Sequence, residues 1–230
     1  NNTGTYNTHA TSAGRIQFNT KWQHVAIVGD ITNTAITKIY IDGVLDSSKI
    51  DWPMPYYNSS TANLRFGEYA GSTDYSDNHY ISDFRIIKGT QLYSGSSNSV
   101  PTAPVSTTDN SPSLVLSANS KTLKDSSANN LTVTVYNTTT SSPSIEAWSP
   151  YASINKQTGF ELPSTTNGGS FSFDGNSQQL KFATSADFEF TGDATVEMWV
   201  YLNSAATGIT PLYGYSATDN TDYFALIILS

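Results

Sequence analysis

The sequence has no cysteine, and only 13% of its 230 residues are charged. The lack of cysteine excludes disulfides, thiolate catalysis and zinc sites built on thiolates. Secreted eukaryotic domains of this size often carry disulfides, so their absence favours folding in a reducing cytoplasm. Lysine and arginine together number 11 and form no basic cluster. We therefore expect neither nucleic acid nor an anionic membrane surface as a partner.

Long apolar runs are also missing from the chain. No run approaches the roughly 20 residues that cross a bilayer, so no membrane insertion is expected. The chain does not begin with methionine, and it stops just after an apolar stretch at 224–229 that reads as a strand. We therefore expect it to be part of a longer protein.

Serine, threonine and asparagine take the place of the missing charge, and their side chains compete with helical backbone hydrogen bonds. Short apolar or alternating runs, bounded by Gly, Asn, Asp and Ser, recur throughout and are typical of strands. Together they predict an all-β protein of two packed antiparallel sheets. The expected strands are 14–18, 22–28, 37–41, 63–66, 80–87, 113–116, 131–136, 170–173, 180–182, 194–202 and 223–229.

Turn and loop signals divide these strands. Asp42-Gly43 stands between two apolar runs and suits the positive backbone angles of a type I′ hairpin. Asp174-Gly175 repeats this punctuation. The stretch at about 94–112 is rich in Ser, Thr and Pro, and its prolines at 101 and 104 disfavour pairing in a central strand. We interpret it as a junction between two units.

Several segments of the first half resemble the later strands of laminin-G-like domains. Trp-Gln-His-Val-Ala-Ile at 22–27 and Lys-Ile-Tyr-Ile-Asp-Gly-Val-Leu at 38–45 are similar to the central strands of that family. Leu-Arg-Phe-Gly at 64–67 and Tyr-Ile-Ser-Asp-Phe-Arg-Ile at 80–86 look like its closing strands. Lys-Gly-Thr-Gln-Leu-Tyr at 88–93, followed by Pro-Thr-Ala-Pro, resembles repeats of bacteriophage tail and virion-surface proteins.

The second half resembles the opening of the same family. The segment at 123–132 is similar to its first hairpin, and those at 170–175, 186–188 and 194–201 are similar to its next strands. The resemblance implies a jelly-roll sandwich of the concanavalin-A-like kind. It makes residues 1–105 the C-terminal half of one such sandwich and residues 106–230 the N-terminal half of another. We prefer a window cut from a tandem array, and a circularly permuted or split sandwich whose halves close on each other is the alternative.

Catalytic residues were sought because glycoside hydrolases share this fold. Retaining hydrolysis requires two carboxylates about 5–5.5 Å apart, and the sandwich hydrolases supply them from a Glu-x-Asp-x-Glu-like strand, whose period of two puts them on the same side. The comparable strand here, 194–202, has only Glu197. We therefore predict that the protein is not an enzyme, with a glycanase as the least favoured class. His24 is expected to have a structural role within the sheet, and Trp199 to lie in the core.

Calcium is the one cofactor that the sequence leaves open. Asp74, Asp77 and Asn78 stand close together in a loop that also carries Gly and Ser. Carboxylates and loop carbonyls can supply the six to eight oxygens that Ca²⁺ requires. The spacing of a dedicated calcium loop is absent, and solvated turn residues are the simpler interpretation.

Aromatic loops are the candidate sites for carbohydrate. Sugar rings stack on Trp and Tyr, while nearby Asn and Asp bind the hydroxyls. A role in packing the sandwich edge or a neighbouring subunit is the alternative for these rings. The candidate sugar-binding residues are Trp52, Tyr56, Tyr57, Tyr69 and Tyr75.

The resemblance implies a non-enzymatic structural module on a phage virion surface, in a tail fibre or a capsid-decorating fibre. Its expected partners are other virion proteins or copies of itself, with a homotrimer favoured, and host-surface glycans are an additional expected ligand. A secreted or cell-surface bacterial carbohydrate-binding lectin module is the alternative. A stable trimer or a location in particles would separate the first class from the second.

Overall fold

The computed structural model of the protein describes residues 7–10, 15–30, 36–49, 63–67, 78–118, 123–136, 144–146, 149–151, 168–175, 178–204, 209–216 and 223–229. Strands dominate these residues, and their one helical element is a single turn of 3-10 helix, η2 (Ala186–Phe188). No helix in this part of the chain is long and apolar enough to span a membrane.

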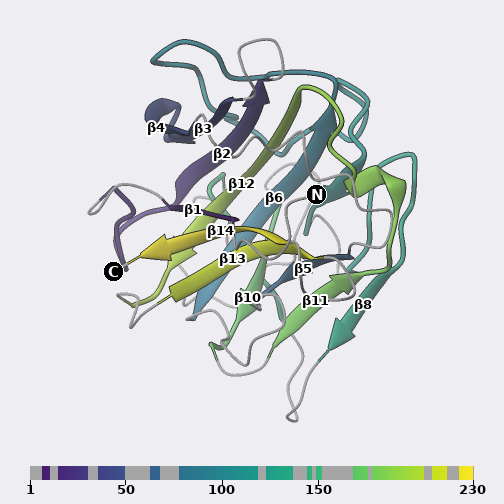
Figure 1. Ribbon diagram of the computed structural model, residues 1–230. Coiled ribbons are helices and arrows are strands. Elements are labelled where there is room, and N and C mark those ends of the chain that lie inside the picture. Colours follow the sequence, from purple (N-terminus) through teal and green to yellow (C-terminus); the bar gives the residue numbers. More distant parts are fainter. Residues whose placement is uncertain are drawn as a thin grey trace.

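The strands lie in two sheets that are antiparallel except where β1 pairs with β14 (Figure 1). The prediction of an all-β sandwich is confirmed. One sheet has the order β1 (Asn7–Ala10), β14 (Tyr223–Leu229), β13 (Ile209–Ser216), β5 (Asn63–Phe66), β11 (Gln179–Phe182) and β8 (Val133–Tyr136). The other has the order β4 (Val44–Lys49), β3 (Ile36–Ile41), β2 (Gln23–Asp30), β12 (Ala194–Leu202), β6 (His79–Lys88), β10 (Ser170–Phe173) and β9 (Ser144–Glu146), with β7 (Leu114–Leu116) also paired to β6.

Strands from the two halves of the chain are interleaved in both sheets. In the eight-stranded sheet, β12 from the second half lies between β2 and β6 from the first. In the six-stranded sheet, β5 from the first half lies between β13 and β11 from the second. Residues 1–105 and 106–230 therefore contribute to one sandwich.

The core lies between the two sheets and is rich in aromatic rings. Phe66 of β5 meets Phe84 of β6 edge-on, with ring centroids 4.6 Å apart. Tyr213 of β13 packs against the same Phe84 ring at 5.5 Å. All three side chains are almost completely buried, so these contacts join the sheets across both halves of the sequence.

Most strand positions agree with the prediction from local sequence, and some differ. The Asp42-Gly43 hairpin is confirmed, because both residues have positive φ and β3 pairs with β4 across them. Asp174-Gly175 joins β10 and β11, which lie in different sheets. Residues 15–16 form a bend and Phe18 makes only an isolated bridge with Leu202, so the predicted strand is not formed over 15–18. The Gln23 side chain binds the backbone of Arg15 and Gln17 in this bend. The strand β13 escaped prediction because Pro211 interrupts its pattern, and its pairing with β14 shifts there.

Residues 89–113, which we call the strap, cross the outer face of the eight-stranded sheet. Tyr93 and Leu92 pack on Ala26, Val28 and Tyr40 of β2 and β3 and form a second apolar cluster outside the main core. The Asn98 amide donates a hydrogen bond to the Gly43 carbonyl at 2.8 Å and anchors the strap to the β3–β4 turn. A Cβ atom on Gly43 would lie 2.1 Å from the Asn98 carbonyl oxygen, so this close approach requires glycine. The junction predicted at about 94–112 thus lies against the sheet.

Candidate functional site

Three neighbouring strands bring charged side chains to the outer face of the eight-stranded sheet. In the register, Glu197 of β12 stands opposite Arg85 of β6, and the next outward residue of β12, Trp199, stands opposite His24 of β2. Side chains alternate between the two faces of a strand, so the outward residues of adjacent strands become neighbours. Val25, Ile27 and the inward residues of β12 fill the core on the opposite face.

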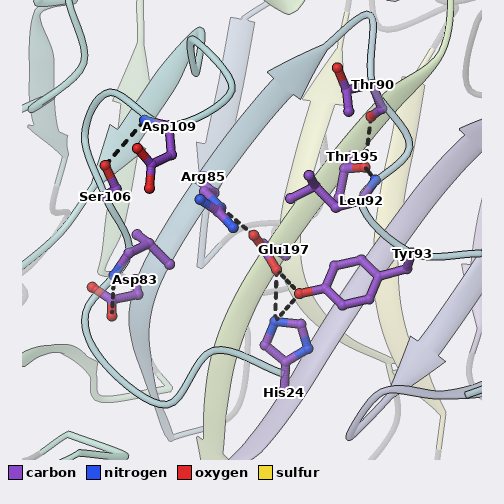
Figure 2. A network of polar contacts seen from close by, with 11 residues as sticks. His24, Asp83, Arg85, Thr90, Leu92, Tyr93, Ser106, Asp109, Thr195 and Glu197 are labelled. Carbon is purple, nitrogen blue, oxygen red and sulfur yellow. Dashed lines mark hydrogen bonds and ion pairs between the residues drawn. The ribbon is translucent and has the colours of Figure 1, made fainter. Parts of the chain in front are cut away.

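Glu197 is the centre of a buried polar network (Figure 2). Arg85 Nε donates a hydrogen bond to Glu197 Oε1, and the hydroxyl of Tyr93, which comes from the strap, donates to Oε2. His24 Nε2 lies 2.9 Å from the same Oε2. A carboxylate only accepts hydrogen bonds, so His24 Nε2 carries a proton and donates it to Oε2. Side chains from three strands and from the strap therefore meet at one carboxylate.

The surroundings of Glu197 hold it in the ionised form. Burial on its own would raise the pKa of this carboxyl, because the charged form loses its hydration. The hydrogen bond and charge of His24, the charge of Arg85 and the hydrogen bond from Tyr93 act in the opposite direction and lower the pKa below its ordinary value of 4.5. Burial is the largest cause that raises the pKa of Tyr93, and the negative charge of Glu197 raises it further. Tyr93 therefore remains neutral and donates its hydroxyl proton.

The strap encloses this network. His24 is 1% exposed and Glu197 is completely buried. The strap is attached on either side, since the Leu92 amide donates to Thr195 Oγ1 at 3.0 Å and the Val105 amide donates to Asp83 Oδ2 at 3.3 Å. A substrate would have to displace the strap to reach either group. In this geometry the network holds the strap onto the sheet.

Asp83 is a second buried carboxyl beneath the strap. It lies on β6 with φ 50°, in the left-handed region, and is 1% exposed. Burial raises its pKa from 3.8 to about 6, and the Tyr151 hydroxyl, the Val105 amide and the Arg85 charge oppose this only in part. Keeping Asp83 ionised at neutral pH therefore lowers the stability of the folded protein relative to the unfolded chain.

The variant Asp83→Asn is expected to be more stable than the wild type at neutral pH. Asparagine tolerates positive φ and keeps an oxygen for the Val105 amide. Because the folded-state pKa is raised, the wild type loses stability as pH rises from about 4 to about 6. Each pKa unit corresponds to about 1.4 kcal/mol, so the gain should approach about 3 kcal/mol above pH 6 and vanish near pH 4.

Urea unfolding of both proteins at pH 4 and pH 7.5 measures this difference. Asp109→Asn is the matched control, because it makes the same substitution at an exposed aspartate, on the strap that covers Asp83. It should change stability by less than about 0.5 kcal/mol at either pH. A gain for Asp83→Asn that is equal at both pH values would contradict the burial of a charged carboxyl.

An aromatic group occupies the same outer face beside the network. Trp22 lies 5.9 Å from Tyr201 and 6.5 Å from Tyr80, centroid to centroid, and all three rings meet at steep angles. Trp22 and Tyr80 are half-buried. The expectation that Trp199 belongs to the core is wrong, because this ring also faces outward and packs against His24 at 5.2 Å. The period of two along β12 places it on the side of Glu197.

The predicted sugar-binding residues Trp52, Tyr56, Tyr57, Tyr69 and Tyr75 lie outside the described residues, as do Asp74 and Asp77. Asn78, the third predicted calcium ligand, is described. It is exposed, its side-chain oxygen accepts a hydrogen bond from Asn203 Nδ2, and its carbonyl accepts one from the Asn203 amide at 3.1 Å. The described ranges contain no group of three His, Cys, Asp or Glu side chains that could hold a metal.

Sequence reasoning identified part of the network. His24 was expected to have a structural role in the sheet, which its contact with Glu197 confirms. The sequence analysis did not identify Arg85 and Tyr93 as partners of Glu197. One available signal was Arg85 itself, since a charged residue in the apolar run Ile81–Ile87 requires a buried partner. Nothing in the sequence pointed to Tyr93, whose contact depends on the path of the strap.

Comparisons of this chain with protein-family models, curated proteins and solved structures gave no match.

Proposed function

We propose that the chain is a non-enzymatic structural module of a phage virion surface, in a tail fibre or capsid-decorating fibre. Its fold is a laminin-G-like, concanavalin-A-like jelly roll in permuted order. The observation that carries this proposal is the pairing of β6 with β12. The first of these strands resembles the closing strand of a laminin-G-like domain and the second resembles an early one. Their direct pairing supports one sandwich assembled from both halves.

The surroundings of Glu197 support the non-enzymatic part of the proposal. This residue lies on the strand where related hydrolases carry their catalytic carboxylates. Here its two oxygens are bound by Arg85, His24 and Tyr93, and the side chain has no exposed surface. General acid catalysis requires a carboxyl that can be protonated near working pH and can reach the substrate. A carboxyl with a lowered pKa under the strap meets neither condition.

The composition of this chain supports the virion assignment, because a protein without cysteine can fold in a reducing cytoplasm and be exposed later, as virion proteins are. The partners that we propose are copies of itself, as a homotrimer, and other virion proteins. Host-surface glycans are the ligand that we propose for adhesion.

The protein is expected to copurify with phage particles and to be trimeric. Mass spectrometry of density-purified particles and light scattering of the isolated protein would measure both properties. Absence from the particles, together with a monomer in the culture medium, would refute the virion assignment and favour a secreted lectin.

A secreted or cell-surface carbohydrate-binding module is the second candidate. The aromatic group of Trp22, Tyr80 and Tyr201 on the outer sheet face favours it, because its half-buried rings, Trp22 and Tyr80, can stack on sugar rings. Its ligand class is the same as that proposed for host adhesion, so particle location and oligomeric state are the measurements that separate the two candidates.

A further inference from the structure

A surface hollow of about 650 Å³ lies between three segments of the chain, away from the Glu197 network. Its walls come from the end of the strap, from residues 126–129 and from η2. The lining includes Thr107, Thr108, Ser126, Asn129 and Asp187. Its volume falls within the range of small-molecule sites in proteins, about 300–1,000 Å³.

The walls of the hollow are tied together by hydrogen bonds. Asn129 Nδ2 donates to Asp187 Oδ1 at 2.8 Å and to the Ser113 carbonyl at 3.0 Å, so one amide joins all three segments. The buried Asp125 carboxylate holds the 126–129 turn by accepting from the Ser127 amide and from the Ser127 hydroxyl, each at 2.8 Å. A site whose walls are already fixed loses less conformational entropy when it binds a ligand.

Asp187 is held in one orientation at the edge of this hollow. The hydroxyl of Ser185, which caps η2, donates to Asp187 Oδ2 at 2.6 Å and accepts from the Asp187 amide at 3.1 Å. Oδ1 accepts one hydrogen bond, from Asn129, and Oδ2 accepts one, from Ser185, whereas each carboxylate oxygen has two lone pairs. Both oxygens therefore retain capacity for a hydroxyl donor from a ligand.

The lining selects a class of ligand by exclusion. Among the described residues, no Lys, Arg or His side chain lines the hollow, so they offer a phosphate, sulfate or carboxylate no counter-charge beside Asp187. The same residues place no aromatic ring on its wall, so they offer a flat aromatic ligand no stacking surface. They offer a calcium ion a single carboxylate, where six to eight oxygens are required. Hydroxyl, amide and carboxylate groups remain, and they suit a neutral ligand with many hydroxyls.

We propose that this hollow binds a neutral saccharide, with Asp187 accepting hydrogen bonds from sugar hydroxyls and Thr108 contributing from the strap. This inference rests on the glycan adhesion proposed above and places it at a site separate from the predicted aromatic loops. Binding through hydrogen bonds without stacking is weak per site, and the multiple copies of a virion fibre would compensate through avidity.

The test uses an array of neutral and anionic oligosaccharides, followed by titration of the best neutral glycan into the wild type and three variants. Asp187→Asn and Thr108→Val change the hollow. Glu189→Gln is the matched control, since it removes the same charge two residues away and does not line the hollow. Thr108 is exposed, so its replacement provides a variant with little effect on folding.

Asp187→Asn is expected to weaken binding about tenfold or more, because hydrogen bonds to a charged acceptor are the strong ones. Thr108→Val should weaken it by a smaller factor, and Glu189→Gln should leave it unchanged. If Trp52→Ala abolishes binding while both hollow variants bind like the wild type, this site is wrong and glycan adhesion stands. If the wild type binds no glycan, glycan adhesion and this site are both refuted, and the particle measurement still tests the virion assignment.

Discussion

Replacing Glu197 with alanine is expected to lower the free energy of unfolding by about 3–5 kcal/mol at pH 7. Removing one partner of a buried ion pair is strongly destabilising, because the remaining charge stays buried without an opposite charge beside it. Arg85 is only 9% exposed and would lose the acceptor of its Nε hydrogen bond. Tyr93 would lose the acceptor that ties the strap to the sheet. Urea unfolding followed by circular dichroism or tryptophan fluorescence measures this loss.

The effect should depend on pH with a definite sign. The pKa of Glu197 is lowered in the folded protein, so its contribution is fully present above the ordinary value of 4.5 and is lost as pH falls below it. The difference between wild type and Glu197→Ala should therefore shrink at about pH 3. Glu197→Gln preserves the volume and one acceptor, and it should lose less than alanine does.

The surface residue Glu189 provides the control for charge. Glu189→Ala removes the same charge from a partly exposed position and should change the free energy of unfolding by less than about 0.5 kcal/mol. If Glu197→Ala also costs less than about 1 kcal/mol, the network contributes little to stability, and the strap is held by its apolar contacts and its other hydrogen bonds.

Separate production of residues 1–105 and 106–230 is expected to yield two fragments that do not fold alone. The second fragment would contain β12 without β2 and β6, its neighbours on both sides. The first would contain β5 without β13 and β11. Each fragment would expose backbone hydrogen-bonding groups and the apolar residues of a shared core. Far-ultraviolet circular dichroism and amide dispersion in NMR spectra would report the absence of structure.

Mixing the two fragments is expected to restore the β spectrum of the whole chain, because every strand then has its partners. The intact chain denatured and refolded under the same conditions is the control for recovery. A fragment that folds cooperatively by itself would contradict the interleaved sandwich and would support adjacent repeats, each completed by sequence outside this chain.

Some contacts of the candidate network could be predicted from the sequence, and others could not. Alternation along 22–28 placed His24 opposite the core-facing residues, and the structure confirms this division, with Val25 and Ile27 in the core. Trp199 was assigned to the wrong side because its size and apolarity outweighed its position in the alternation. Tyr93 could not be found, since its partner Glu197 is 104 residues away and no local pattern specifies a contact of that range.

The sequence by itself determined that this protein is built of strands and where most of those strands lie. It also determined the hairpin turn at Asp42-Gly43, whose two residues have positive φ. These features depend on side-chain alternation and on backbone preferences within a few residues. Tertiary structure decided which strands are neighbours, that both halves share one core, and that Arg85, His24 and Tyr93 converge on Glu197. Those outcomes depend on apolar faces that can be buried only against one another and on a buried charge that requires partners from distant strands.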